Sequence, residues 1–197
     1  MNIEELFNLE PVDESIVNKK ISSLDKRKPP TYKNIPTKNL VKNKDIISPI
    51  ITDIYNDSSN NSHFPNFLKL ADVIPAHKKG ERTMKDNYRP VSILPPISKI
   101  FERNIFEQLS SYIEKLLSPS LFGFRKGYST QHCLSIMINK WKKAIDSGKI
   151  AGALITDLSK AFDCLNHELL IAKLGAYGFS HSSLKYIYRS FRSKTKN

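Results

Sequence analysis

The sequence predicts an α+β fold, because long stretches with apolar residues at helical spacing are interrupted by a few short extended ones. Its 197 residues are enough for one ordinary domain with a hydrophobic core of its own. Hydrophobic residues make up 40% and charged residues 25% of the chain, as in soluble globular proteins. This composition argues against a chain that is disordered throughout.

Three classes of protein are disfavoured by simple counts. No apolar run approaches the roughly 18 residues that a membrane span requires. The opening letters MNIEELFNLE carry acids where a secretory signal would be basic and then apolar. Two cysteines, Cys133 and Cys164, are too few for a disulfide framework or for a four-cysteine zinc site. We therefore expect an intracellular protein in a reducing compartment.

Charge gives the first indication of a partner. The chain has 31 Lys and Arg against 19 Asp and Glu, a net charge of +12. A positive field of this size favours polyanions, with nucleic acid first and an acidic membrane surface second. The alternative is a lysine-rich protein whose basic residues form an ordinary solvated surface. The positions of the charges decide between the two.

The N-terminal part of the chain predicts two helices and a strand. Asp13 stands where a cap would begin a helix that places Val17 and Ile21 on one face. A second helix is predicted over residues 37–55, ending in a polar turn at residues 56–61. Residues 71–75 are typical of a short extended piece.

Residues 77–89 predict a basic hairpin arm. Five basic and two acidic residues occupy these thirteen positions, and a glycine interrupts them between extended flanks. The basic residues are Lys78, Lys79, Arg82, Lys85 and Arg89. Such an arm could bind nucleic acid or a triphosphate, although charged runs are more often plain solvated loops. Together with the net charge, the pattern favours binding.

A long helix is predicted over residues 97–117, followed by a glycine loop at residues 121–128. The loop holds Arg125, whose planar fork suits phosphate oxygens, next to aromatic residues that can stack on bases. Ser129 or Thr130 can cap the next helix. We interpret the stripe of that helix that includes Met137 and Trp141 as core.

Asp157 follows residues 150–156, a short apolar run typical of a buried strand. A carboxylate at the end of such a strand can bind magnesium together with water and phosphate oxygens. The alternative is that Asp157 only begins a turn. Asp163 and His167 share a helical face but lack further ligands for a transition metal. Neither a phosphate-binding Gly-x-x-x-x-Gly-Lys loop nor a Gly-x-Ser-x-Gly nucleophile turn occurs.

Four strings in order resemble the reverse transcriptases of non-long-terminal-repeat (non-LTR) retrotransposons of the jockey and LINE type. They are LKLADVIPAHKKG (68–80), NYRPVSILPPISKIFE (87–102), FGFRKGYST (122–130) and ALITDLSKAFDCLNHELL (153–170). The resemblance implies a right-hand polymerase fold. It also implies a tail over residues 1–10 and a partial polymerase domain over 11–197, with fingers over 11–149 and the start of the palm over 150–197.

The resemblance also implies roles for residues that match the family motifs. Asp157 would be one of three acids that hold two magnesium ions for nucleotidyl transfer. Phe162 would lie beneath the sugar and exclude its 2′-hydroxyl. Arg89, and one of Lys78 and Lys79, would contact the incoming deoxynucleoside triphosphate.

The glycine loop is implied to lie near the template or the nucleotide through Arg125, with Gly127 beside it. The resemblance implies an RNA template and a DNA primer as partners, with no membrane partner, and the oligomeric state stays open. It implies an intracellular site of action, in the nucleus or the cytoplasm.

The sequence departs from the family in one important respect. The aromatic-Ala-Asp-Asp hairpin that carries the other two acids does not occur in these 197 residues. Leu121 also stands where the family usually has glutamine, and residues 30–33 replace a stretch that usually contains Gly and Asp. We expect a polymerase fragment, truncated before the catalytic hairpin and inactive alone. The alternatives are a basic nucleic-acid-binding module, a retrotransposon remnant, and a helical protein-interaction domain.

Overall fold

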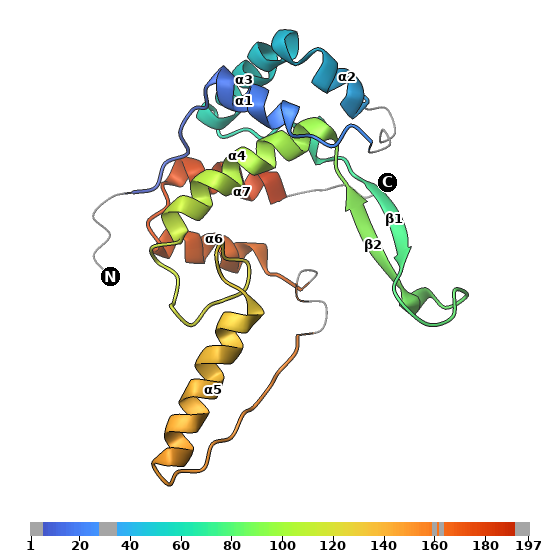
Figure 1. Cartoon of the computed structure of the whole chain (residues 1–197). Helices are drawn as coiled ribbons and strands as arrows, with labels where there is room; N and C mark the ends of the chain where they lie inside the picture. The colour runs from blue at the N-terminus through green and yellow to red at the C-terminus, as the bar shows by residue number, and fades with distance from the viewer. Residues whose placement is uncertain (1–5, 28–34, 159–160, 162–163, 192–197) are drawn as a thin grey trace. The chain divides into compact units, whose positions relative to one another are not determined.

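The computed structural model describes residues 6–27, 35–158, 161 and 164–191. These residues contain helices and one small sheet, which agrees with the predicted α+β class (Figure 1). In chain order the elements are α1 (Glu14–Ser22), α2 (Thr37–Lys42), α3 (Lys44–Asn60), the 3-10 helix η1 (Asn66–Lys69), β1 (Asp72–His77), the 3-10 helix η2 (Lys85–Asn87), β2 (Tyr88–Ile93), α4 (Pro96–Ile113), α5 (Thr130–Asp146), α6 (His167–Ala176) and α7 (His181–Phe191).

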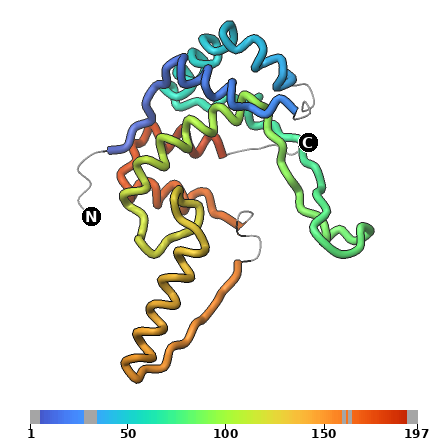
Figure 2. Tube along the Cα trace, viewed as in Figure 1, coloured from blue at the N-terminus to red at the C-terminus, as the bar shows by residue number. Residues whose placement is uncertain are grey.

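The chain divides into two compact units. Unit 1 comprises Met1–Ser110 together with His167–Asn197, and unit 2 comprises Ser111–Asn166. Figure 2 follows the trace from one unit into the other and back. This division differs from the expected boundary between fingers and palm at residues 149 and 150, which stays a prediction.

The core of unit 1 is built around aromatic rings from four segments. Phe101 of α4 contacts Tyr55 of α3 edge-on, with ring centroids 5.1 Å apart, and Phe64 at 5.9 Å. Phe64 in turn lies 5.7 Å from Tyr186 of α7. Such tilted and edge-on pairs add to the stabilisation from burial alone. Val17 of α1 is also fully buried, as its helical spacing predicts.

The prediction of a polar turn at residues 56–61 is wrong, because α3 continues to Asn60. Tertiary hydrogen bonds explain the difference. The Asn56 side chain accepts from the Val12 amide at 2.8 Å and donates to the Val12 carbonyl at 3.0 Å. The Ser58 hydroxyl lies 2.8 Å from the Tyr186 hydroxyl. The predicted single helix is instead broken at Asn43, which separates α2 from α3.

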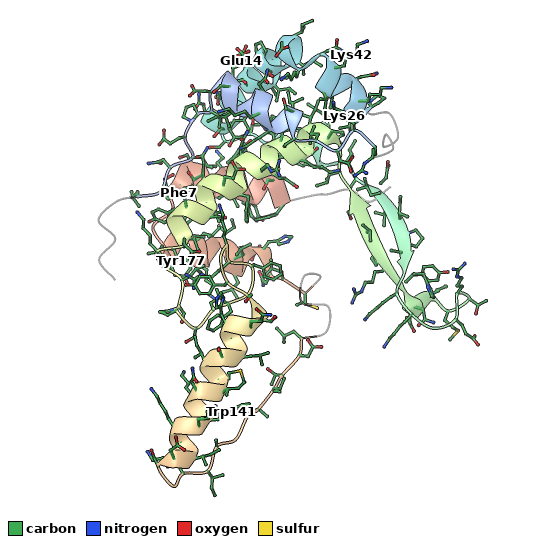
Figure 3. All side chains as sticks on the ribbon, in the orientation of Figure 1. Phe7, Glu14, Lys26, Lys42, Trp141 and Tyr177 are labelled. Carbon is green, nitrogen blue, oxygen red and sulfur yellow. The ribbon has the colours of Figure 1, made fainter. Side chains whose placement is uncertain are left out.

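Residues 6–10, the described part of the expected tail, are attached to unit 1. Phe7 forms a parallel bridge with Phe179, and their rings lie 4.4 Å apart. The Phe7 amide donates to the Gly178 carbonyl at 2.8 Å, and the Ser180 amide donates to the Phe7 carbonyl at 2.9 Å. Figure 3 labels Phe7 at this position. The hydrogen bonds make this segment part of the fold.

Unit 1 is expected to lose stability in alkali between pH 10 and 12. Burial raises the pKa of Tyr186 from its ordinary 10.0 to about 12, against the smaller opposing effect of its hydrogen bond with Ser58. The neutral phenol therefore stabilises the fold fully below pH 10, and this contribution disappears as the pH rises through 12. The difference of two units between the folded-state pKa and the ordinary pKa corresponds to about 3 kcal/mol of stability. Urea unfolding at each pH measures the loss, which should be smaller in Tyr186→Phe; an equal loss in that variant contradicts the assignment.

Two expectations for unit 2 are wrong. In α5 no residue is buried, so the stripe that includes Met137 and Trp141 is not a covered core (Figure 3). Residues 150–156 form no strand, and Ile150 and Leu154 are 100% and 92% exposed. A buried strand needs paired neighbours on each side. The sheet in the described part of the chain contains only β1 and β2, so these residues have no strand to pair with.

Candidate nucleic-acid interface

The basic arm predicted over residues 77–89 is confirmed as an antiparallel hairpin of β1 and β2 (Figure 1). Pairing runs from Asp72 opposite Ile93 to His77 opposite Tyr88. The Lys78 amide donates to the Asn87 carbonyl at 2.7 Å, which extends the ladder by one residue. The basic residues are therefore carried on a hydrogen-bonded ribbon.

Alternation along the strands gives the ribbon two faces. Residues directly opposite one another share a face, and neighbours along a strand lie on opposite faces. The face that we call the proline face carries the pairs Pro75 with Pro90 and His77 with Tyr88. The other, which we call the Arg89 face, carries the pair Ala76 with Arg89.

The tip of the hairpin is held by side-chain hydrogen bonds. The Tyr88 hydroxyl donates to the Arg82 carbonyl at 2.7 Å, and the Asn87 amide donates to the Glu81 carbonyl at 2.8 Å. His77 Nε2 lies 2.9 Å from the Gly80 carbonyl oxygen. Gly80 has φ +78°, and a Cβ there would lie 2.6 Å from the Asn87 side chain. A side chain at this position is therefore excluded on both grounds.

The basic side chains of the arm are exposed. Within residues 6–27, 35–158, 161 and 164–191, no carboxylate forms an ion pair with any of the five. They are Lys78, Lys79, Arg82, Lys85 and Arg89. Unpaired cations on an ordered ribbon are available to phosphate oxygens without first breaking a salt bridge.

The guanidinium of Arg125, by contrast, already forms hydrogen bonds within unit 2. Two of its nitrogens donate to one Glu114 oxygen at 3.0 and 2.6 Å, and its Nη1 donates to the Ser118 and Leu121 carbonyls, both at 3.0 Å. The guanidinium also lies 4.2 Å from the centroid of the Tyr128 ring. The hydrogen bond with Glu114 raises the pKa of Arg125 further, and only 7% of the side chain is exposed. These contacts make Arg125 the residue that holds the glycine loop together.

Two neighbours of Arg125 have left-handed backbone conformations. Gly127 has φ +82°, which only glycine adopts without strain. Phe124 has φ +58° and is 97% exposed. The loop geometry thus explains Gly127 without a ligand, and the implied template contact of Arg125 and Gly127 stays a prediction. Glu114 was missed in the sequence, since nothing in the pattern pairs residues eleven positions apart across a loop.

Replacing Arg125 with lysine is expected to loosen the loop although it keeps the charge. A lysine ammonium cannot reproduce the fork that bonds Glu114 and the two carbonyls at once. Amide hydrogen exchange over residues 118–128 should accelerate about tenfold or more, since each lost bond involves a charged group. Lys126→Ala is the matched control, because Lys126 is exposed. Equal exchange in the two variants would show that Arg125 does not hold the loop.

Asp157 lies in the exposed segment of unit 2, at the end of residues 150–156. Among the described residues, no group of three or more His, Cys, Asp or Glu is placed to hold a metal ion. Asp157 has the hard oxygen donors that magnesium prefers, but the described part of the chain does not group with it the further acids that two ions would require. Phe162 lies outside the described residues. Because the hairpin is in unit 1 and Asp157 in unit 2, the joint site implied by the resemblance stays a prediction.

Comparison with known proteins identifies the class. The family described as reverse transcriptase (RNA-dependent DNA polymerase) matches residues 76–197, which include β2 and the whole basic arm of residues 77–89. This is a family of nucleotidyltransferases. The chain belongs to the reverse transcriptase family, as its motifs predicted, and the family implies a polymerase fold and the use of divalent metal ions.

Several relatives are named as RNA-directed DNA polymerases from transposons or mobile elements. The chain is 34% identical over 127 residues to the probable RNA-directed DNA polymerase from transposon X-element of Drosophila melanogaster, covering 63% of this chain and 14% of that protein. It is 32% identical over 124 residues to that from transposon BS, covering 61% and 14%. It is 33% identical over 123 residues to the RNA-directed DNA polymerase from mobile element jockey of Drosophila melanogaster, covering 61% of this chain and 13% of that protein. The chain thus spans about one-seventh of these relatives.

None of the helices in the described part of the chain is long and apolar enough to cross a membrane.

Proposed function

We propose that this chain is part of an RNA-directed DNA polymerase that uses an RNA template, a DNA primer and deoxynucleoside triphosphates. The observation that carries the proposal is the ordered hairpin, whose unpaired cations fall within the residues that match the family. Polymerisation depends mainly on positioning and on charge stabilisation of phosphates, and a rigid basic ribbon supplies both. An intracellular site of action, in the nucleus or the cytoplasm, belongs to the same proposal.

The hairpin favours Lys78 over Lys79 as the partner of Arg89. Lys78 lies two residues after Ala76, so strand alternation puts it on the Arg89 face. It is then a diagonal neighbour of Arg89, within about 7–8 Å between backbone positions, which is within reach of one triphosphate. Lys79 follows on the turn, where the ladder has ended. We therefore assign the triphosphate contact to Lys78 and Arg89.

Asp157 is proposed as one of the carboxylates that hold two magnesium ions in a complete polymerase. Bound magnesium supplies charge stabilisation of the reacting phosphates. The described residues place no group of acids that could hold two ions, so we propose that the chain does not polymerise alone. Phe162 is retained as the proposed residue beneath the sugar, and Arg125 with Gly127 as a loop near the template or nucleotide.

A matched pair of variants tests the triphosphate assignment. Lys78→Ala should weaken binding of a deoxynucleoside triphosphate about tenfold, because a charge-assisted contact is lost. Lys79→Ala removes the same charge from the next residue and should change binding less than twofold or so. Titration calorimetry measures both. The larger loss in Lys79→Ala would reverse the assignment, and no loss in either variant or in Arg89→Ala would refute triphosphate binding by the hairpin.

The alternative function is a non-enzymatic module, or a retrotransposon remnant, that only binds nucleic acid. The exposed cations support binding without any catalytic group. Two results would favour this alternative. The chain would bind nucleic acid but no deoxynucleoside triphosphate, and it would show no primer extension when the rest of a related polymerase is supplied.

A further inference from the structure

The proline face of the hairpin contains a hollow that the triphosphate assignment does not use. Its volume is about 600 Å³. The floor is formed by Val73, Pro75, Tyr88 and Pro90, and the tip contributes Arg82 and Lys85. Sites for small ligands span about 300–1,000 Å³, so the hollow is large enough for one nucleotide. It lies on the opposite side of the ribbon from Arg89.

The lining combines a flat apolar floor with positive charge. The hydrogen bond from the Tyr88 hydroxyl to the Arg82 carbonyl fixes the tyrosine ring against the tip. The ring of His77 meets it edge-on at 5.3 Å. Among the described residues Arg82 and Lys85 form no ion pair. An aromatic ring for a base and cations for the backbone are the two features of single-strand binding sites.

A protein strand is a poor occupant of this arm. Pro75 and Pro90 face one another in the ladder, and a proline can occupy such a pair only where its missing N–H would point away from the partner strand. Each outer edge of the ribbon therefore lacks a backbone N–H donor near its middle, at Pro75 in β1 and at Pro90 in β2. Addition of a third strand needs those donors. The charge and the edges both favour a nucleic acid over a peptide.

We propose that the proline face binds an unpaired nucleotide of a single-stranded nucleic acid. The base lies against Tyr88 and the two prolines, and the phosphate is bound by Arg82 and Lys85. This inference rests on the proposed function in taking the hairpin as a nucleic-acid-binding arm, and it adds a second site on the side away from Lys78 and Arg89. The hairpin then lies between the single-stranded nucleic acid on its proline face and the triphosphate on its Arg89 face.

Charge-reversal variants of the 197-residue chain test the site. In Arg82→Glu/Lys85→Glu, the affinity for a 12-nucleotide single-stranded RNA, measured by fluorescence anisotropy, should fall more than tenfold. The control Lys140→Glu/Lys142→Glu makes the same charge change at exposed positions of α5 in unit 2 and should cost about threefold or less. Equal losses in the two variants mean that only the net charge matters and overturn the site.

Photo-crosslinking of the unmodified chain provides a test that needs no variant. An oligonucleotide with 5-iodouridine should crosslink to the peptide that contains Tyr88, and excess duplex of the same sequence should compete poorly. A crosslink elsewhere overturns the proposal, as does single-strand binding that the double variant leaves unchanged. Triphosphate binding should survive in Arg82→Glu/Lys85→Glu and fall in Lys78→Ala, so failure of this site is distinguishable from failure of the proposed function.

Discussion

Replacing Phe101 with alanine is expected to lower the free energy of unfolding of unit 1 by about 3–5 kcal/mol. Phe101 is fully buried and contacts the rings of Tyr55 and Phe64 at the centre of the aromatic cluster. The substitution removes the transfer free energy of the ring and leaves a cavity that these neighbours fill only in part. A loss of this size is comparable with the whole stability of many small domains.

Urea unfolding followed by far-ultraviolet circular dichroism measures the effect. Phe106→Ala is the matched control, because Phe106 is on the same helix and is 61% exposed. It removes the same atoms and changes helix propensity in the same direction, so we expect a change within about 0.5 kcal/mol. Similar losses in the two variants would mean that Phe101 is not in a packed core.

Replacing Asp157 should have the largest effect on polymerase activity, once a related polymerase supplies the other two catalytic acids. The chain alone is expected to give no primer extension. We expect extension from a chimera in which residues 76–197 replace the matching segment of the jockey polymerase. In that chimera Asp157→Asn should lower the rate by at least about 10³-fold if Asp157 is the proposed metal ligand, because losing such a ligand removes several kcal/mol of charge stabilisation and each 1.36 kcal/mol is tenfold.

The control variant is Asp146→Asn, which changes the same group at the end of α5. It should leave the rate of the chimera within about twofold, as expected for an exposed surface substitution. Extension by the 197-residue chain alone, or an active chimera that is indifferent to Asp157→Asn, would refute the assignment. Primer extension on an RNA template, resolved on a denaturing gel, distinguishes these outcomes.

Local sequence signals predicted the elements whose partners are close in the chain. Val17 and Ile21 are buried on α1 as their spacing predicts, and Ser129 caps α5 by accepting from the His132 amide. The hairpin was predictable because its two strands are separated by a short basic turn. In each case the periodicity and the turn residues carry the information.

The errors concern elements whose state depends on distant residues. Helix α3 continues past Tyr55 because Val12 and Tyr186 bond its polar end, and these lie 44 and 128 residues away. The apolar residues 150–156 were predicted as a buried strand from composition, which cannot reveal whether neighbouring strands exist.

The candidate site was predicted in part. The arm and its cations follow from the charge pattern, and alternation along the strand then separates Lys78 from Lys79 once the register is known. The binding of Arg125 by Glu114 could not be foreseen, because a basic residue in a glycine loop suits a phosphate and a carboxylate equally well. Only the folded loop shows which of the two it meets.

The single tryptophan of the chain, Trp141, lies on the uncovered stripe of α5 and is 37% exposed. Indole emission shifts to shorter wavelength when water is excluded from the ring. Binding of any polypeptide that covers this stripe, including the other parts of a polymerase, should therefore shift the intrinsic fluorescence to shorter wavelength. The protein needs no added dye for such a titration, and Trp141→Phe supplies the blank.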